Sequence, residues 1–171
     1  AAAVILPPDY SNKDLNDSKI MTEKMRNMLR KEIESVAITF SVASVSVEEI
    51  DQMNILNASF LAMHRAIEKL DPLPEHLIID GNRFKPFRDI RYTCVIKGDG
   101  QYYSIAAASV LAKTYRDEFM IKINQDFPDY GWDANKGYAT LRHRNAIASK
   151  GITFWHRKSF RLMDEQLKLE F

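Results

Sequence analysis

Ser-Ile-Ala-Ala-Ala-Ser-Val-Leu-Ala-Lys-Thr-Tyr-Arg-Asp, residues 104–117, is the stretch that decides the fold. Positions four, three and four residues apart form one stripe along a helix, and here they hold Ala106, Val110, Lys113 and Asp117. Because the stripe begins with small residues, the helix backbone can approach a neighbouring sheet closely and carry Lys113 and Asp117 to the end of that sheet. The spacing predicts a central helix over residues 104–127.

A second apolar run, residues 77–79, stops abruptly at Asp80-Gly81, as a buried strand does when it delivers a carboxylate to the edge of a sheet. Asp80 and Asp117 therefore end two buried elements, which suggests a metal site. Two alternatives stay open. Asp-Gly is also a common turn, and Asp117 is also spaced for an exposed ion pair with Lys113, worth about 0.3 to 0.5 kcal/mol.

Strands and helices alternate along the rest of the chain. Apolar patterns predict strands at 1–6, 37–45, 77–80 and 92–97. Capping residues Thr22, Ser46 and Thr140 begin helices, of which the second runs to Pro72, and a last helix is expected at 160–169. This order indicates one α/β layered domain over residues 1–171, with a basic helical C-terminal part at 131–171.

Composition sets the class of protein. The chain of 171 residues has 46% hydrophobic residues, enough for a well-formed core, and its single cysteine excludes an intrachain disulfide. No apolar run approaches the roughly 20 residues of a membrane span. We expect a cytoplasmic protein. Ala1 opens directly inside an apolar run, so we also expect that an upstream segment is missing.

Charge is distributed unevenly. Residues 131–161 contain seven Lys and Arg against Asp133 alone, while the whole chain has a net charge of +1. This polarity suits a protein that holds a polyanion on one side and cations on another. A solvated helix face is the alternative interpretation.

Seven ordered blocks of sequence resemble ribonuclease HII, the type 2 ribonuclease H. The blocks are Leu15-Asn16-Asp17-Ser18-Lys19, Asn54-Ile55-Leu56 with Ala62-Met63, Ile79-Asp80-Gly81, Lys97-Gly98-Asp99 with residues 104–113, Arg116-Asp117, Gly137-Tyr138-Ala139-Thr140 with His143, and His156-Arg157-Lys158-Ser159-Phe160.

The resemblance implies an α/β ribonuclease H-like fold, with a mixed central sheet flanked by helices and a helical C-terminal part. It implies a hydrolase, an endonuclease that acts in DNA replication and repair on RNA/DNA hybrid duplexes or on ribonucleotides embedded in DNA, leaving 3′-hydroxyl and 5′-phosphate ends. Two Mg²⁺ or Mn²⁺ ions are expected, because hard cations take oxygen ligands. Asp80 and Asp117 match two of the family's four carboxylates.

One family motif has no counterpart. The family's first strand ends in Asp-Glu-Ala-Gly-Arg-Gly and lies between the strands expected at 1–6 and 77–80. Without it, backbone groups would stay unpaired at about 1 to 3 kcal/mol each if buried. We therefore expect the 171-residue chain to be inactive. The alternatives are a catalytically dead nucleic-acid-binding remnant and a type HIII relative.

Substrate contacts are also implied by the resemblance. Tyr138 matches the tyrosine that packs on the sugar at the RNA-to-DNA junction, and its alternative is a half-buried loop residue. Lys19 is a candidate phosphate contact or an ordinary surface lysine, and Arg142, Arg144, Arg157 and Lys158 are weaker candidates. His143 and His156 are expected to be structural hydrogen bonders, because Mg²⁺ prefers oxygen.

The last six residues, Gln166-Leu167-Lys168-Leu169-Glu170-Phe171, are similar to the short peptides by which bacterial replication proteins bind the sliding clamp. Such a peptide places its leucine and phenylalanine side chains in apolar pockets of the partner. The alternative is the apolar edge of a terminal helix.

Overall fold

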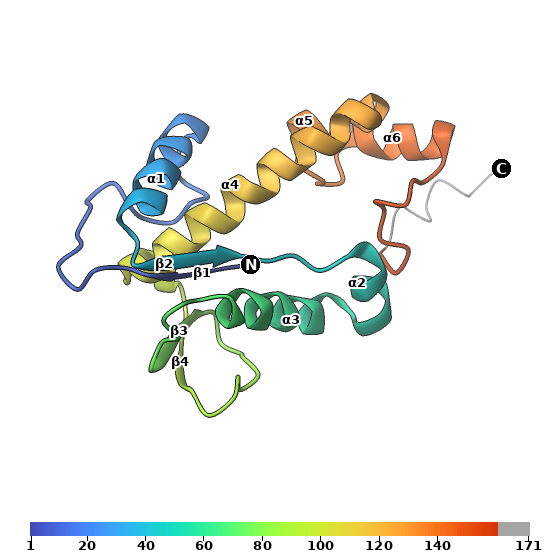
Figure 1. The fold of residues 1–171 in the computed structure, drawn as a ribbon. Coiled ribbons are helices and arrows are strands. Elements are labelled where there is room, and N and C mark those ends of the chain that lie inside the picture. The colour runs from blue at the N-terminus through green and yellow to red at the C-terminus, as the bar shows by residue number, and fades with distance from the viewer. Residues whose placement is uncertain (161–171) are drawn as a thin grey trace. The chain divides into compact units, whose positions relative to one another are not determined.

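The computed structural model describes residues 1–160 of the chain (Figure 1). The chain divides into two compact units, of which unit 1 comprises residues 1–45 and 56–115, and unit 2 comprises residues 46–55 and those from 116 onward. The predicted single domain stays a prediction. The helix expected at 160–169 lies, after Phe160, outside the part of the chain that the structure describes.

Unit 1 contains four strands. Strand β1 (Ala2–Ile5) pairs antiparallel with β2 (Thr39–Val42), and β3 (His76–Asp80) pairs in parallel with β4 (Arg91–Val95). Over residues 1–160 these pairs are two separate two-stranded sheets. The strands expected at 1–6 and 77–80 are therefore not paired with each other. This agrees with the resemblance, which implied that a further strand lies between them.

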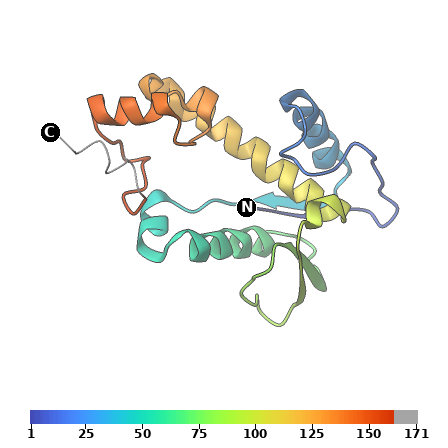
Figure 2. The same cartoon turned by 180° about the vertical axis from the view of Figure 1, so that it is seen from behind.

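Helices cover both faces of the β1–β2 sheet within unit 1 (Figures 1 and 2). Helix α1 (Glu23–Val36) and the first half of α4 (Tyr103–Asp126) share a core with alternate residues of β1 and β2, including Val4 and Phe40. On the other face, the Ser41 hydroxyl donates to the carbonyl of Ala66 in α3 (Ile55–Glu68). The small residues of α4 lie in this core as predicted, with Ala106 only 1% exposed.

The sequence predicts one continuous helix from Ser46 to Pro72, and this prediction is wrong because the structure has two helices there. Helix α2 (Val47–Met53) begins at the predicted capping box of Ser46 and Glu49 and ends at Asn54. Asn54 has φ 70° and ψ 163°, which removes it from the helix, and α3 then begins at Ile55. Apolar spacing continues through this position, so the periodicity of the sequence carries no sign of the break.

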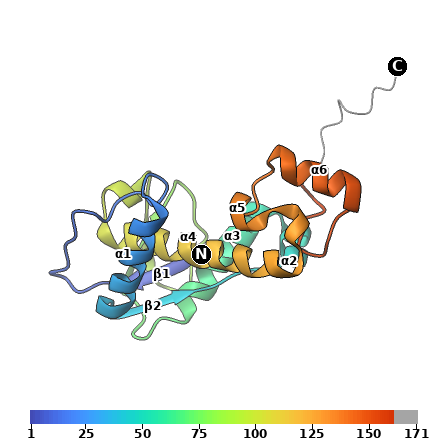
Figure 3. The same cartoon turned by 90° about the horizontal axis from the view of Figure 1, so that it is seen from above.

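Unit 2 surrounds the second half of α4 with short elements: the 3₁₀ turn η2 (Pro128–Tyr130), α5 (Trp132–Asn135) and α6 (Leu141–Lys150) (Figure 3). Thr140 caps α6 as predicted. Helix α5 is a single turn, because residues in the left-handed conformation stand at both its ends. No helix found in residues 1–160 is both long and apolar enough to cross a membrane.

Candidate active site and nucleic-acid interface

Asp80 is held at the end of β3 by the turn that follows β4. This turn is the 3₁₀ helix η1 (Gly98–Gly100), and the Gly98 N–H donates to Asp80 Oδ1 at 3.0 Å. A Cβ on Gly98 would lie 2.5 Å from Cδ1 of Ile105, so any larger residue here would require the Ile105 side chain to shift. Asp80 is exposed, whereas Asp99 in the same turn is only 7% exposed.

A second segment of unit 1 brings Asp17 and Lys19 to the same place. The Lys19 N–H donates to Asp17 Oδ1 at 2.9 Å, and Lys19 Nζ lies 3.9 Å from that oxygen. Between them, Ser18 is 3% exposed and its hydroxyl lies 2.8 Å from that of Ser109 on α4. The Arg26 guanidinium also donates to the Ser18 carbonyl at 3.1 Å. The Asp17–Lys19 turn is therefore fixed from two sides.

These groups form an electrostatic cluster around Asp99. Burial raises the pKa of Asp99, and the nearby charges of Asp17 and Asp80 raise it further, while Lys19 acts in the opposite direction. Asp17 and Asp80 thus act on Asp99 inside unit 1. Among residues 1–160, no group of three or more His, Cys, Asp or Glu side chains is arranged so that it could hold a metal ion.

Asp117 is the second carboxylate that the sequence predicts as a metal ligand. It is on α4, 9% exposed, and belongs to unit 2, whereas Asp80 belongs to unit 1. Its role as a metal ligand stays a prediction.

Tyr138 lies in a loop of unit 2 and is 67% exposed. Its backbone N–H donates to the Asn135 carbonyl at 2.9 Å, and the preceding Gly137 has φ +82°. A Cβ on Gly137 would meet both Arg116 Nη2 and Met120 Cε at 3.0 Å. The loop is thus pressed against α4 while the tyrosine ring remains accessible, so the half-buried alternative does not describe it.

The predicted phosphate contacts of unit 2 differ in how firmly they are held. Arg142 is exposed, with its guanidinium close to Gly131. Arg157 is half-buried, and its Cζ lies 3.8 Å from the centroid of the Phe160 ring. Burial, and then the charge of Arg116, lower the pKa of Arg157 from its usual value, while Asp51 acts against them.

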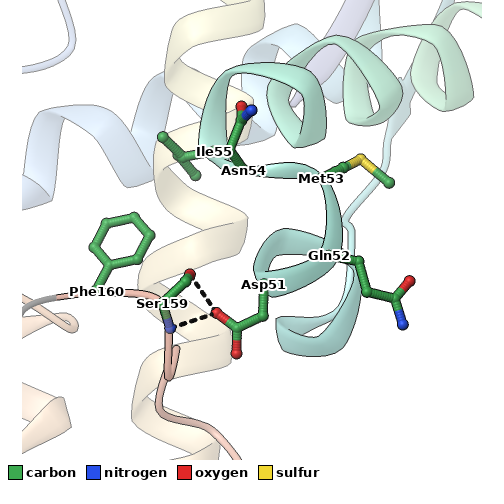
Figure 4. A pocket seen from close by; sticks show the side chains of 7 residues that line it. All are labelled: Asp51, Gln52, Met53, Asn54, Ile55, Ser159 and Phe160. Atoms are coloured by element: carbon green, nitrogen blue, oxygen red, sulfur yellow. Dashed lines mark hydrogen bonds between the residues drawn. The ribbon is translucent and has the colours of Figure 1, made fainter.

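Asp51 of α2 fixes the chain next to Arg157. Its carboxylate accepts the Lys158 N–H at 2.9 Å. It also accepts the Ser159 N–H at 3.0 Å and the Ser159 hydroxyl at 2.5 Å (Figure 4). These bonds lower the pKa of Asp51. They also close one side of a shallow pocket of about 530 Å³, lined by residues 51–55, Ser159 and Phe160.

The two histidines make hydrogen bonds inside unit 2, as expected. His143 Nδ1 lies 3.0 Å from the Tyr130 carbonyl, and His156 Nδ1 accepts the Thr153 N–H at 2.9 Å. Their rings stack with centroids 5.3 Å apart, and both side chains are about 5% exposed.

Asp17 and Asp99 are the candidate residues that sequence reasoning missed. Both stand in the motifs that carry the resemblance, but the sequence alone assigned neither of them a role. The buried carboxylate of a Gly-Asp-Gly turn that directly follows a strand is the signal that could have identified Asp99.

Comparison with known proteins gives one consistent answer. The family profile described as Ribonuclease HII matches residues 1–163. A curated relative from Christiangramia forsetii, named Ribonuclease HII, is 60% identical over all 171 residues, which span 86% of its length. These findings confirm the resemblance that the ordered motifs indicated, and they favour type HII over type HIII.

Solved structures agree on the fold. The PCNA:RNase HII complex from Archaeoglobus fulgidus matches with a TM-score of 0.71 at 24% identity, covering 87% of this chain and 79% of that one. Bst-RNase HIII in complex with Mn²⁺ matches with a TM-score of 0.59 at 18% identity, covering 79% and 50%. At such identities the likeness concerns the fold, and it confirms the predicted α/β class.

Proposed function

This chain belongs to the ribonuclease HII family of endonucleases that act on RNA/DNA hybrids, and from this we propose how its own residues serve the reaction. The reaction is hydrolysis of a phosphodiester in the RNA strand, leaving a 3′-hydroxyl and a 5′-phosphate. The observation that carries the proposal is the convergence of Asp80, Asp99 and Asp17 beside Lys19 in unit 1.

Asp80 and Asp99 hold Mg²⁺ or Mn²⁺. Their fit to a hard cation rests on the donor set, which consists of carboxylate oxygens, and on the raised pKa of Asp99, since a cation beside it would offset the repulsion from Asp17 and Asp80. A bound divalent ion supplies Lewis-acid activation of the attacking water and neutralises charge on the leaving oxygen. The Gly98 N–H fixes one oxygen of Asp80, which orients the other.

The remaining residues bind the duplex. Lys19, Arg142 and Arg157 contact backbone phosphates, which position a nucleic acid without reading its sequence. Tyr138 offers its exposed ring to the sugar at the junction of RNA and DNA, where an aromatic face disfavours a 2′-hydroxyl. Asp117 remains a proposed further ligand of the metal.

Metal binding tests the carboxylate assignment directly. We would measure Mn²⁺ binding by titration calorimetry for the wild type and for Asp80→Asn, Asp99→Asn and Asp117→Asn, with exposed Asp89→Asn as the matched control. The proposal expects weaker binding in the first two and no change in the control. Unchanged Mn²⁺ binding in Asp99→Asn would exclude Asp99 as a ligand. Weaker binding in Asp117→Asn would support Asp117 as a further ligand, and unchanged binding would exclude it.

Cleavage tests the reaction. The 171-residue chain, which carries two of the family's four carboxylates, is proposed to bind a hybrid duplex but not to cut it. We would compare it with a chain extended at its N terminus by a strand that bears Asp-Glu-Ala-Gly-Arg-Gly. Metal-dependent cutting next to the ribonucleotide only in the extended chain is the expected result, and cutting by the 171-residue chain alone would refute this part.

A second proposed partner is a sliding clamp, bound through residues 166–171, which lie outside the described residues. The solved complex of Archaeoglobus fulgidus ribonuclease HII with PCNA supports this type of assembly. Pull-down by the clamp of the full chain, and not of a chain ending at residue 165, is expected. Equal capture of both chains would remove the idea.

A further inference from the structure

Asp51 connects two segments of unit 2 that lie far apart in sequence. One of its oxygens accepts the Lys158 N–H at 2.9 Å, and the other accepts both the N–H and the hydroxyl of Ser159 (Figure 4). Asp51 lies 107 and 108 residues before these partners. Hydrogen bonds to an ionised carboxylate are among the stronger ones, so the three bonds hold helix α2 and the chain after α6 together.

These bonds fix a turn that begins at Arg157. The Phe160 N–H donates to the Arg157 carbonyl at 3.3 Å and closes the turn, and the two N–H groups between these residues donate to Asp51. The same turn places the Arg157 guanidinium over the Phe160 ring, with Cζ 3.8 Å from the centroid. An aromatic face orients a guanidinium without cancelling its charge, and it leaves the N–H donors in the guanidinium plane for an anion.

The chain is also fixed on the other side of Arg157. The preceding residue, His156, is buried, and its ring packs against those of Tyr130 and Trp132 with centroids 5.0 and 5.2 Å away. Arg157 therefore lies between a buried anchor and the anchor that Asp51 provides. A side chain whose backbone is held in this way loses less conformational entropy when it binds a ligand.

The charge of Asp51, taken alone, predicts the opposite effect on binding. Residues 131–161 contain seven Lys and Arg against Asp133 alone, and a carboxylate beside this basic segment repels a polyanion. Removing Asp51 should then strengthen the binding of nucleic acid. If Asp51 instead acts by holding the turn of Arg157, its removal should weaken binding. The sign of the effect thus separates positioning from charge.

We propose that Asp51 is a positioning residue for nucleic-acid binding, which holds the turn that presents Arg157 to one backbone phosphate of the duplex. Asp51 itself does not touch the substrate. The ligand class is a phosphodiester, whose oxygens suit the planar fork of a guanidinium. The identity of the polymer rests on the proposed function, whereas the hold of Asp51 on the turn does not.

The first test is binding to a fluorescent RNA/DNA hybrid, measured by anisotropy at several salt concentrations. Asp51→Ala should bind the hybrid about three- to tenfold more weakly, because Arg157 is no longer held in place. It should also lose up to about 0.9 from the slope of log K against log salt, which is the contribution of one phosphate contact. Unchanged or tighter binding would show that only the charge of Asp51 matters and would overturn the proposal.

Glu48→Gln is the matched control, because Glu48 is an exposed carboxylate on the same helix. It should bind the hybrid as tightly as the wild type or slightly more tightly, and a loss equal to that of Asp51→Ala would contradict positioning. Ser159→Ala removes one of the three bonds and no charge, so it should weaken binding by less. Should Asp51→Ala fail to fold, Ser159→Ala replaces it, and unchanged binding in Ser159→Ala then overturns the proposal.

A double-mutant cycle identifies the side chain through which Asp51 acts. Arg157→Ala alone should weaken binding, and adding Asp51→Ala should cause little further loss, since the phosphate contact is already gone. In a Lys158→Ala background, the effect of Asp51→Ala should persist. Additive losses with Arg157→Ala would mean that Asp51 acts on binding by another route, which would refute the assignment to Arg157.

Amide hydrogen exchange of Lys158 and Ser159 tests the anchor without nucleic acid. Both amides should be protected in the wild type and in Glu48→Gln, and both should exchange faster in Asp51→Ala. Equal exchange in Asp51→Ala and the wild type would overturn the anchor even if the hybrid binds. Faster exchange in Asp51→Ala, together with a wild type that binds no hybrid, would support the anchor and refute only the proposed function.

Discussion

His156 makes the stability of unit 2 depend on pH in a way that the structure defines. Its Nδ1 accepts the Thr153 N–H, so the neutral ring carries its proton on Nε2, which is buried and has no hydrogen-bond partner among the described residues. A second proton would have to go to Nδ1 and displace the Thr153 N–H. Burial, and then the neighbouring His143, accordingly lower the pKa of His156.

The groups packed around His156 offer no charge to stabilise an imidazolium. Its ring contacts His143, Tyr130 and Trp132, with ring centroids 5.3, 5.0 and 5.2 Å away. Arg157 follows in sequence and carries the same charge as an imidazolium would. The folded state therefore binds fewer protons than the unfolded state below pH 6.5, the usual pKa of histidine.

The magnitude follows from linkage. Where only the unfolded state takes up the proton, the free energy of unfolding falls as the pH drops below 6.5, by at most about 1.4 kcal/mol between pH 7.5 and pH 5.5. The loss levels off at pH values below the lowered pKa of the folded state, because the folded protein then binds the proton too. Stability is thus fully present above pH 6.5 and lost on acidification.

Tryptophan fluorescence is the assay, because both tryptophans of the chain, Trp132 and Trp155, belong to unit 2. Guanidinium unfolding would be followed at pH 7.5 and pH 5.5 for the wild type, for His156→Gln and for the control His76→Gln, whose histidine is exposed in unit 1. The acid-induced loss should shrink only in His156→Gln, whatever its absolute stability. An equal loss in that variant and the wild type would refute the reasoning.

Three further outcomes are expected in unit 1. Gly98→Ala should lower the free energy of unfolding by about 1 to 3 kcal/mol in circular dichroism, because its Cβ would meet Ile105 at 2.5 Å; an unchanged midpoint would contradict this close approach. Ser18→Ala and Ser109→Ala should each cost about 1 kcal/mol and together less than the sum, since their hydroxyls bond each other, whereas additive losses would show independent roles. Burial, with the Glu32 carboxylate, raises the pKa of Tyr10 to about 12, so ultraviolet titration should show a tyrosine that ionises near pH 12, and this component should be lost in Tyr10→Phe.

Local signals in the sequence predicted the elements well. Side chains of Thr22, Ser46 and Thr140 accept the backbone N–H groups that they were expected to cap. Each of these bonds spans three residues, so the sequence contains all of its determinants. The break at Asn54 could not be predicted. The positive φ of this asparagine depends on contacts with distant parts of the chain, which its neighbours in sequence do not reveal.

The candidate site was predictable only in part, for the same reason. Asp80 could be identified because the strand and the carboxylate are adjacent in sequence. The importance of Asp99 depends on the packing of Gly98 against Ile105 and on the arrival of Asp17 from a distant segment. Neither contact produces a periodic pattern in the sequence, so composition and spacing did not identify Asp99.

Like charges in unit 1 connect the proposed metal site to the stability of the protein. The pKa of Asp99 is raised by burial and then by the charges of Asp17 and Asp80. A divalent cation beside Asp99 should offset this repulsion. Because a ligand that binds only the folded state stabilises it by RT ln(1 + [L]/Kd), Mg²⁺ or Mn²⁺ should raise the unfolding midpoint measured by circular dichroism. The rise should be smaller in Asp99→Asn than in the wild type, and an equal rise in both would contradict the assignment of Asp99 as a ligand.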